Sequence, residues 1–139
     1  METGSFDRTI RSDINEIPEI SSRLETVMRA NGFPDEDILD TQLAVEEAIT
    51  NIIMHGYQGI NGEITLSCRA GSGGIEIRLE DRAPPFDPLS LPEPDLNGDI
   101  GERKIGGLGV FLIRRVMDEI RYRYEDGKNI LILTKRKKA

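Results

Sequence analysis

Glu47 and Asn51 are the first residues whose types and spacing suggest chemistry. They lie four residues apart in the apolar stretch from Leu43 to Tyr57. At about 100° per residue, their side chains are neighbours on one helix face. The apolar residues gather on the opposite face, at Val45, Ala48, Ile49, Ile52 and Ile53. The bland alternative is an ordinary amphipathic helix whose polar face meets water, so the rest of the chain must show whether this pair has a role.

Asp81 is the second candidate, because it continues an alternating strand pattern. Ile75, Ile77 and Leu79 share one face of the expected strand, and the alternation places Asp81 on that same core face. A carboxylate in an apolar layer is costly unless hydrogen bonds reach it, and a ligand amino group would supply one. The alternative is a structural Asp that caps the turn through residues 83–84.

A group of glycines is the third candidate. Gly106, Gly107 and Gly109 precede or open an expected helix. Glycine lets the backbone approach a ligand closely, and free amides at a helix start favour phosphate. Glycine-rich turns are common, however, and the pattern is not a Walker motif because no Gly-Lys-Ser/Thr follows.

The elements that must position these residues can be read from the hydrophobic periodicity. The pattern predicts strands at 6–14, 63–69, 74–82, 120–124 and 129–134, and helices at 17–31, at 34–57 and from 110 onward. Residues 84–107 are rich in Pro, Asp and Gly and have no period, which is typical of a functional lid. This order predicts an α/β (α+β) two-layer sandwich with a mixed or largely antiparallel sheet.

Composition limits the class of protein. The chain has 139 residues, 37% of them apolar and 31% charged, which predicts one domain spanning 1–139. Its net charge of −7 argues against general nucleic-acid binding, and the basic run 135–138 is expected to be a solubilising tail. One cysteine and one histidine argue against an internal disulfide and an ordinary zinc site. No stretch has the roughly 18 apolar residues that a membrane span needs.

In combination, the three candidates resemble a known family. The motifs are Glu47-Ala48-Ile49-Thr50-Asn51 continuing to His55-Gly56-Tyr57, Asp81 running into Pro85-Phe86-Asp87-Pro88, and Gly107-Leu108-Gly109. Their order and contexts resemble the bacterial anti-sigma-factor serine kinases of the GHKL (histidine-kinase-like, Bergerat-fold) ATPase superfamily, from about residue 6 to 135. The resemblance implies a Bergerat-type fold: a mixed, mostly antiparallel sheet covered on one face by three helices, with an ATP lid at about 84–106.

The resemblance also gives each motif residue a role. It implies that Asn51 coordinates Mg²⁺, which bridges the phosphates of ATP, and that Glu47 is the general base for an attacking serine hydroxyl. Asp81 would accept a hydrogen bond from the adenine amino group. Gly107 and Gly109 would wrap the phosphates. Further expected cofactor-binding positions are Ala83, Gly106, Leu108 and Lys104.

Some positions are less specific. Lys104 and Arg103, in the lid, are candidates for phosphate contact. Glu46 is a rival base, although its direction is about 100° from Glu47 and off the Asn51 face. His55 is expected to pack or to form a hydrogen bond at the helix end. Ala83 departs from the family pattern, which has glycine there, so its methyl group could crowd the adenine.

The resemblance implies a cytoplasmic ATP-binding anti-sigma factor and protein serine kinase that uses Mg²⁺. Its partners would be a sigma factor and a STAS-type anti-anti-sigma antagonist, which it phosphorylates. Members of the family commonly form homodimers, and neither nucleic acid nor membrane is an expected partner. Two alternatives remain open: a nucleotide-binding partner-switch module with little or no kinase activity, and the ATP-binding domain of a histidine kinase.

Overall fold

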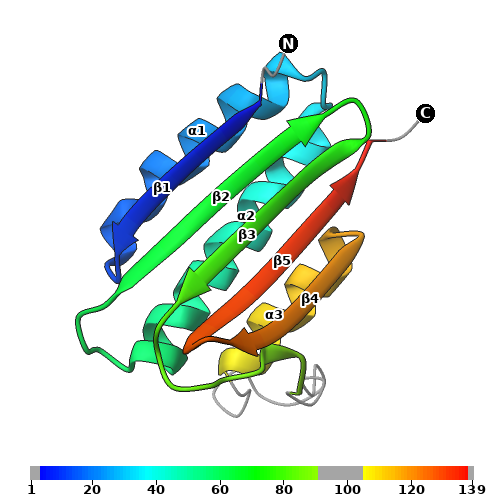
Figure 1. Ribbon diagram of the computed structural model, residues 1–139. Coiled ribbons are helices and arrows are strands. Elements are labelled where there is room, and N and C mark those ends of the chain that lie inside the picture. The colour runs from blue at the N-terminus through cyan, green and yellow to red at the C-terminus, as the bar shows by residue number, and fades with distance from the viewer. Residues whose placement is uncertain (1–3, 91–104, 138–139) are drawn as a thin grey trace.

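The computed structural model describes residues 4–90 and 105–137. These residues form a two-layer α+β sandwich, in which one five-stranded sheet carries all three α-helices on the same face (Figure 1). The strand order is β1-β2-β3-β5-β4, and all four pairings are antiparallel. The expected fold class is confirmed, and the described strands contain no parallel pairing. The strands are β1 (Ser5–Arg11), β2 (Glu63–Gly71), β3 (Gly74–Asp81), β4 (Glu119–Glu125) and β5 (Lys128–Arg136).

The core lies between the sheet and the helices. On β3, Ile75, Ile77 and Leu79 are buried on the helix-covered face, and Asp81 is buried in the same alternation. On the neighbouring strand β5, the residues paired with Ile77 and Leu79 are Leu133 and Leu131. The interior strand β2 adds Ile64, Leu66 and Cys68 to this apolar layer, and the alternation along β3 and β5 also determines which polar side chains enter it.

The helices bury one stripe each. Helix α1 (Ile17–Ala30) has a proline in its first turn and buries residues at helical spacing, namely Ile17, Ile20, Leu24 and Met28. Helix α2 (Asp35–Asn51) opens with three acidic residues, which suit the positive end of its dipole. Helix α3 (Ile105–Val116) packs beside α2 behind β5 and β4 (Figure 1).

Several element boundaries differ from the predictions. Strand β1 ends at Arg11, because the Asp13 side chain accepts a hydrogen bond from the backbone N–H of Asn15 and starts a 3₁₀ turn over Ile14–Glu16. The predicted second helix reaches Tyr57 only through a π-helix, Ile52–Tyr57, that follows α2. Strand β3 ends one residue early, because the Arg82 N–H donates to the Tyr57 hydroxyl instead of a neighbouring strand.

The segment after β3 is described in part. Residues 84–90 include a short 3₁₀ turn, Pro88–Ser90, and the Leu89 carbonyl accepts a hydrogen bond from Arg114 of α3. Helix α3 begins at Ile105, five residues before the predicted start, so it takes in the last two residues of the predicted lid. The prediction for 91–104 lies outside the described residues. Within the described ranges, no helix has the length and apolar character that crossing a membrane requires.

Candidate functional site

Helices α2 and α3 meet at the first pair of predicted site residues. Gly109, in the first half of α3, lies against Glu47 and Asn51: a Cβ atom added to it would stand 2.9 Å from Glu47 Oε2 and 3.2 Å from Asn51 Nδ2. Only a glycine permits this close approach without a shift of those side chains. The structure therefore brings together three residues that lie up to 62 positions apart, and α3 covers the polar face of α2 that a simple amphipathic helix would expose to water.

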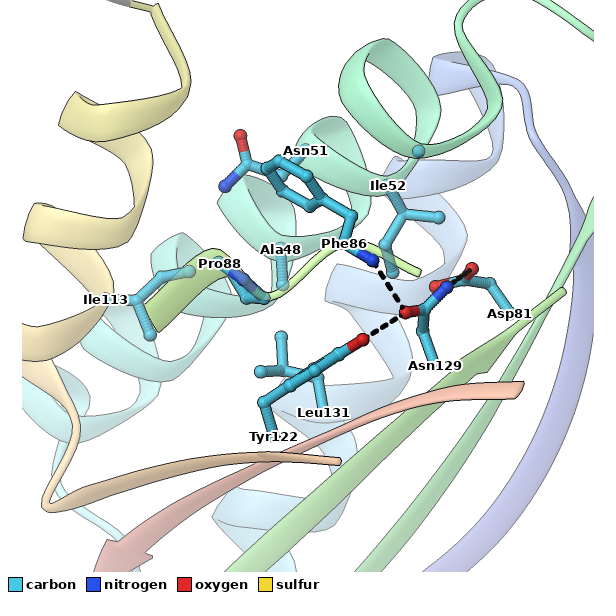
Figure 2. A pocket seen from close by; sticks show the side chains of 11 residues that line it. Ala48, Asn51, Ile52, Asp81, Phe86, Pro88, Ile113, Tyr122, Asn129 and Leu131 are labelled. Atoms are coloured by element: carbon cyan, nitrogen blue, oxygen red, sulfur yellow. Dashed lines mark hydrogen bonds between the residues drawn. The ribbon is translucent and has the colours of Figure 1, made fainter. Parts of the chain in front are cut away.

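A cavity continues from Asn51 to Asp81. It lies between the ends of α2 and α3 and the strands β3, β4 and β5, and Figure 2 shows Asn51 and Asp81 on different sides of it. The lining residues come from every segment near this end of the sheet: Ala48, Asn51, Ile52, Gly56, Asp81, Phe86, Pro88, Ile113, Tyr122, Asn129 and Leu131. Two polar residues from separate segments, Asn51 and Asp81, thus share one mostly apolar pocket.

Asp81 is 6% exposed, as the strand alternation predicts. Its Oδ1 accepts hydrogen bonds from the backbone N–H of Ala83 at 3.0 Å and from Asn129 Nδ2 at 2.9 Å. Burial raises the pKa of Asp81 above its ordinary value, and the bonds from Asn129 and Ala83 partly oppose that rise. The site therefore contains a buried carboxylate that is stabilised on one oxygen by the protein and is well suited to accept a further hydrogen bond.

Glu47 and its rival Glu46 have different surroundings. Glu47 is half-buried beside Gly109, whereas Glu46 is exposed. Desolvation raises the pKa of Glu47, and the neighbouring Glu46 carboxylate raises it further. A carboxylate with a raised pKa is a better proton acceptor, so Glu47 has the properties that a general base needs.

Asn51 is 7% exposed, and its Nδ2 has no hydrogen-bond partner among the described residues. An unpaired buried amide is costly and commonly indicates a ligand contact. No group of three His, Cys, Asp or Glu side chains in the described ranges could hold a metal. A Mg²⁺ ion at this site would therefore depend on Asn51, the nearby Glu47 and ligand phosphates.

Phe86 lines the cavity. Its ring points toward the Asn51 side of the cavity in Figure 2 and stacks on His55, with the ring centroids 6.1 Å apart and the planes inclined by 21°. The cavity volume is about 30 Å³, which is about the space of one water molecule and too small for a purine. The packing role expected of His55 is observed, and its Nε2 has no partner among the described residues.

The alanine at position 83 has a specific neighbour. A Cβ atom added to Gly56 would lie 3.3 Å from the Ala83 methyl group, so the glycine leaves room for that methyl. Ala83 is 3% exposed and does not line the cavity. The crowding that its methyl group could cause is therefore directed at the helix end and not into the pocket.

The sequence reasoning missed two residues at this site. Asn129 from β5 bonds to Asp81, and Tyr122 from β4 donates its hydroxyl hydrogen to Asn129 Oδ1 (Figure 2). One sequence signal was present, because Asn129 is the polar residue of an alternation that continues with Leu131 and Leu133. Of the remaining predicted positions, the backbone of Gly106, Gly107 and Leu108 lies in the first turn of α3, while Arg103 and Lys104 lie outside the described residues.

Comparisons with known proteins agree with this geometry. Residues 10–135 match the model of the histidine kinase-like ATPase domain. The chain is 37% identical over 106 residues to the serine-protein kinase RsbW of Listeria monocytogenes, covering 73% of this chain and 68% of that protein. It is 34% identical over 105 residues to the RsbW of Bacillus cereus, covering 73% and 66%.

A solved structure shows the same fold. The crystal structure of the RsbU and RsbW domains of Rv1364c from Mycobacterium tuberculosis matches with a TM-score of 0.67 at 22% identity, over 96% of this chain and 32% of that one. The match to the domain model covers most of the sequence, and the sheet and helices described above have the corresponding architecture. The chain therefore belongs to the histidine kinase-like ATPase family, and its relatives include the RsbW serine-protein kinases.

Proposed function

We propose that this protein is an anti-sigma factor and MgATP-dependent serine kinase that phosphorylates a STAS-type anti-anti-sigma antagonist. Support comes from the family and from relatives that are named serine-protein kinases. The observation that carries the proposal is the meeting of Glu47, Asn51 and Gly109 at one end of a pocket that has Asp81 at the other. A base and a metal ligand at one end and a buried acceptor at the other suit a nucleotide with its phosphates toward α3.

The two ends of the pocket would have separate tasks. Asp81 would accept a hydrogen bond from the exocyclic amino group of adenine, in an apolar surrounding that strengthens such a bond. The amides in the first turn of α3, including that of Gly107, would contact the phosphates, because a helix N-terminus favours anions. Gly109, in the next turn, would let the helix backbone lie close to them. Asn51 would hold Mg²⁺ at the phosphate end, with its amide oxygen as the ligand.

Glu47 would act on the serine hydroxyl that receives the phosphoryl group. Bound MgATP supplies the phosphoryl group: the bond between the γ-phosphorus and the ADP oxygen breaks, and a bond to the serine Oγ forms. The proton of the serine hydroxyl passes to the Glu47 carboxylate. Because phosphoryl transfer depends mainly on positioning and charge stabilisation, the fixed contact between Glu47 and α3 would keep the base in line.

The pocket must open before a nucleotide enters. The present cavity holds about one water molecule, so the Phe86 ring would have to leave its position against His55. The ring can leave by rotation of its side chain, and residues 87–90, within the predicted lid, would move with it. The chemistry of the surrounding donors and acceptors suits ATP once this ring is displaced.

The partners follow from the same proposal. A sigma factor would be bound, and the phosphorylated antagonist would be unable to release it. A homodimer and a cytoplasmic location belong to the proposal because the family that the motifs resemble implies both. Direct binding to nucleic acid is not proposed, since the net charge of −7 would oppose it.

The decisive experiment compares two glutamates. The wild type, Glu47→Gln and Glu46→Gln would each be incubated with an antagonist protein and γ-labelled ATP, with and without Mg²⁺. We expect Glu47→Gln to lower the transfer rate by about 10²–10⁴-fold, the usual contribution of a positioned base. Glu46→Gln, a matched change at an exposed neighbour, should stay within about threefold of the wild type.

Three results have different meanings. Equal loss in both variants would contradict the assignment of Glu47 as the base. Tight ATP binding by the wild type with no label on any serine would favour the partner-switch module without kinase activity. Label on a histidine of a partner protein would favour the histidine-kinase alternative.

A further inference from the structure

Asn129 is a buried polar residue to which the proposed chemistry assigns no role. It is 6% exposed, lies near the start of β5 and pairs in register with Asp81 on β3. The next inward-facing residues of β5 are Leu131 and Leu133. A primary amide in such a layer is costly unless its hydrogen-bonding groups are satisfied, so its partners explain its presence there.

Both ends of the Asn129 amide are occupied. Nδ2 donates to Asp81 Oδ1 at 2.9 Å, to the Ala83 carbonyl at 3.0 Å and to the Pro84 carbonyl at 3.2 Å. Oδ1 accepts from the Phe86 backbone N–H at 3.1 Å and from the Tyr122 hydroxyl. Figure 2 shows the amide at the centre of this network. One side chain therefore connects the carboxylate to three backbone groups of the segment that follows it.

The orientation of the amide follows from its neighbours. Backbone carbonyl oxygens can only accept, and a backbone N–H can only donate. The two carbonyls therefore require the NH₂ group on their side, and the Phe86 N–H requires the oxygen on the other. Since the NH₂ group also faces Asp81, that carboxylate receives a donor at Oδ1, which favours its ionised form.

An ionised Asp81 can only accept a hydrogen bond. At position 6 the amino group of a 6-aminopurine donates, whereas the oxygen of a 6-oxopurine accepts and would repel a carboxylate. The nearest donor of a 6-oxopurine, N1–H, lies one ring atom away, so a carboxylate fixed opposite position 6 meets a donor only in the 6-aminopurine. The bonds from Asn129 and the Ala83 N–H commit Oδ1 to the protein, so a ligand donor would meet the other oxygen. The same amide also fixes the backbone around Ala83 and Pro84, which determines where the purine edge can lie.

We propose that Asn129 is a positioning residue that determines purine selectivity: it holds Asp81 as an obligate acceptor and thereby makes the pocket prefer a 6-aminopurine over a 6-oxopurine nucleotide. This inference rests on the proposed nucleotide-binding function. It goes beyond that function because it assigns the selectivity for the base to Asn129, which lies on the strand next to that of Asp81.

The sharpest test is Asn129→Asp, measured by calorimetry with ATP and with ITP. The substitution hardly changes the side-chain volume, and it retains an oxygen for the Phe86 N–H and the Tyr122 hydroxyl while removing the NH₂ group. The two adjacent carboxyl groups would share a proton, so that the pair can donate as well as accept. We expect ATP affinity to fall by about 10–100-fold, the effect of losing a charge-assisted hydrogen bond, and ITP affinity to fall much less or to rise.

Two further variants separate selectivity from general damage. Asn15→Asp makes the same change at an exposed position of the first 3₁₀ turn and should leave the ATP:ITP ratio unchanged. Asn129→Leu removes the donor without adding a charge, and its ATP:ITP ratio should also fall. Thermal unfolding of each variant identifies those that are folded. A loss of stability alone would lower the affinities for ATP and ITP equally and would leave their ratio unchanged.

A measurement on the wild type does not depend on whether any variant folds. The side-chain NH₂ signals of Asn129 in an NMR spectrum should exchange slowly and should shift when ATP binds. Fast exchange, or a folded Asn129→Asp protein with the wild-type ATP:ITP ratio, would overturn this inference while leaving the proposed function intact. A wild type that binds neither nucleotide would instead refute the proposed function.

Discussion

Gly109 lies so close to Glu47 that a single added methyl group would stand 2.9 Å from the Glu47 Oε2 atom. In the middle of a helix, alanine is more favourable than glycine by about 0.8–1 kcal/mol. The glycine therefore reduces the stability of α3 and permits the approach of the two helices. The position of the Glu47 carboxylate therefore depends on a glycine at a helix position where propensity alone would favour alanine.

Gly109→Ala should uncouple activity from stability. We expect the added methyl group to displace the Glu47 carboxylate, lowering the phosphoryl-transfer rate about tenfold, while the unfolding temperature stays the same or rises. Kinetic assays and thermal unfolding measure the two effects. Gly71→Ala is the control, because a Cβ there would meet nothing within 4 Å. A Gly109→Ala protein with full activity would show that the close contact does not position Glu47.

Asn51→Ala should remove the dependence of nucleotide binding on Mg²⁺. The Asn51 Nδ2 atom has no partner among the described residues, so its deletion breaks no hydrogen bond there and should change the free energy of unfolding by less than about 1 kcal/mol. Calorimetry with ATP in Mg²⁺ and in a chelator gives the ratio of affinities. We expect a ratio of about ten or more in the wild type and near one in the variant. Asn61→Ala, at an exposed loop, should keep the wild-type ratio.

Asp81→Asn should abolish ATP binding and yet stabilise the fold at neutral pH. Burial raises the pKa of Asp81 in the folded state above the ordinary 3.8. The stability contributed by the protonated form is therefore complete below about 3.8 and is lost as pH rises through the raised folded value. At pH 7 the buried charge is unfavourable, and the neutral amide removes this cost.

The pH dependence provides the check on Asp81. The stability difference between Asp81→Asn and the wild type should shrink as the pH falls toward 4, in unfolding experiments at a series of pH values. ATP affinity of the wild type should fall over the same range, because a protonated Asp81 is a poorer acceptor. Asp126→Asn, in the exposed turn between β4 and β5, is the matched control. A variant that is less stable than the wild type at pH 7 and equally so at pH 4 would contradict the reasoning.

Phe86→Ala should speed the entry of nucleotide. The Phe86 ring leaves a cavity of about 30 Å³ and must be displaced before a purine can bind. Removing the ring should raise the association rate constant of a fluorescent ATP analogue by roughly tenfold, equivalent to about 1.4 kcal/mol of activation free energy. Stopped-flow fluorescence measures this rate. Phe6→Ala, on the edge strand β1, should leave it unchanged, and an unchanged rate in Phe86→Ala would show that the ring does not limit entry.

Local patterns predicted much of this architecture. The alternation of Ile75, Ile77 and Leu79 was enough to place Asp81 in the core, because side chains of a strand alternate strictly. The spacing of Glu47 and Asn51 was enough to make them neighbours. The helical spacing resumes only at Val110, because the glycines before it have no side chain that could extend the pattern, so the sequence pointed to a later start for α3 than Ile105.

The residues that the sequence could not reveal depend on long-range pairing. Asn129 reaches Asp81 only because β3 and β5 are neighbours in register, although the two residues are 48 positions apart. The inward position of Phe86 depends on that same amide, since its N–H is fixed by Asn129 Oδ1. Neither contact has a period or a spacing in the sequence, so the topology of the sheet had to be known first.

The two ends of the pocket differ in how rigidly the backbone around them is held. Asp81 and Asn129 belong to β3 and β5, which are both bonded to strands on either side, so the purine end is part of a continuous backbone ladder. Glu47 and Gly109 belong to helices that touch through side chains and a glycine, and such helices can slide past each other. Substitutions at the purine end should therefore be poorly tolerated. The position of Glu47 relative to the phosphates, in contrast, can be adjusted by small helix movements, including those that a docked protein imposes.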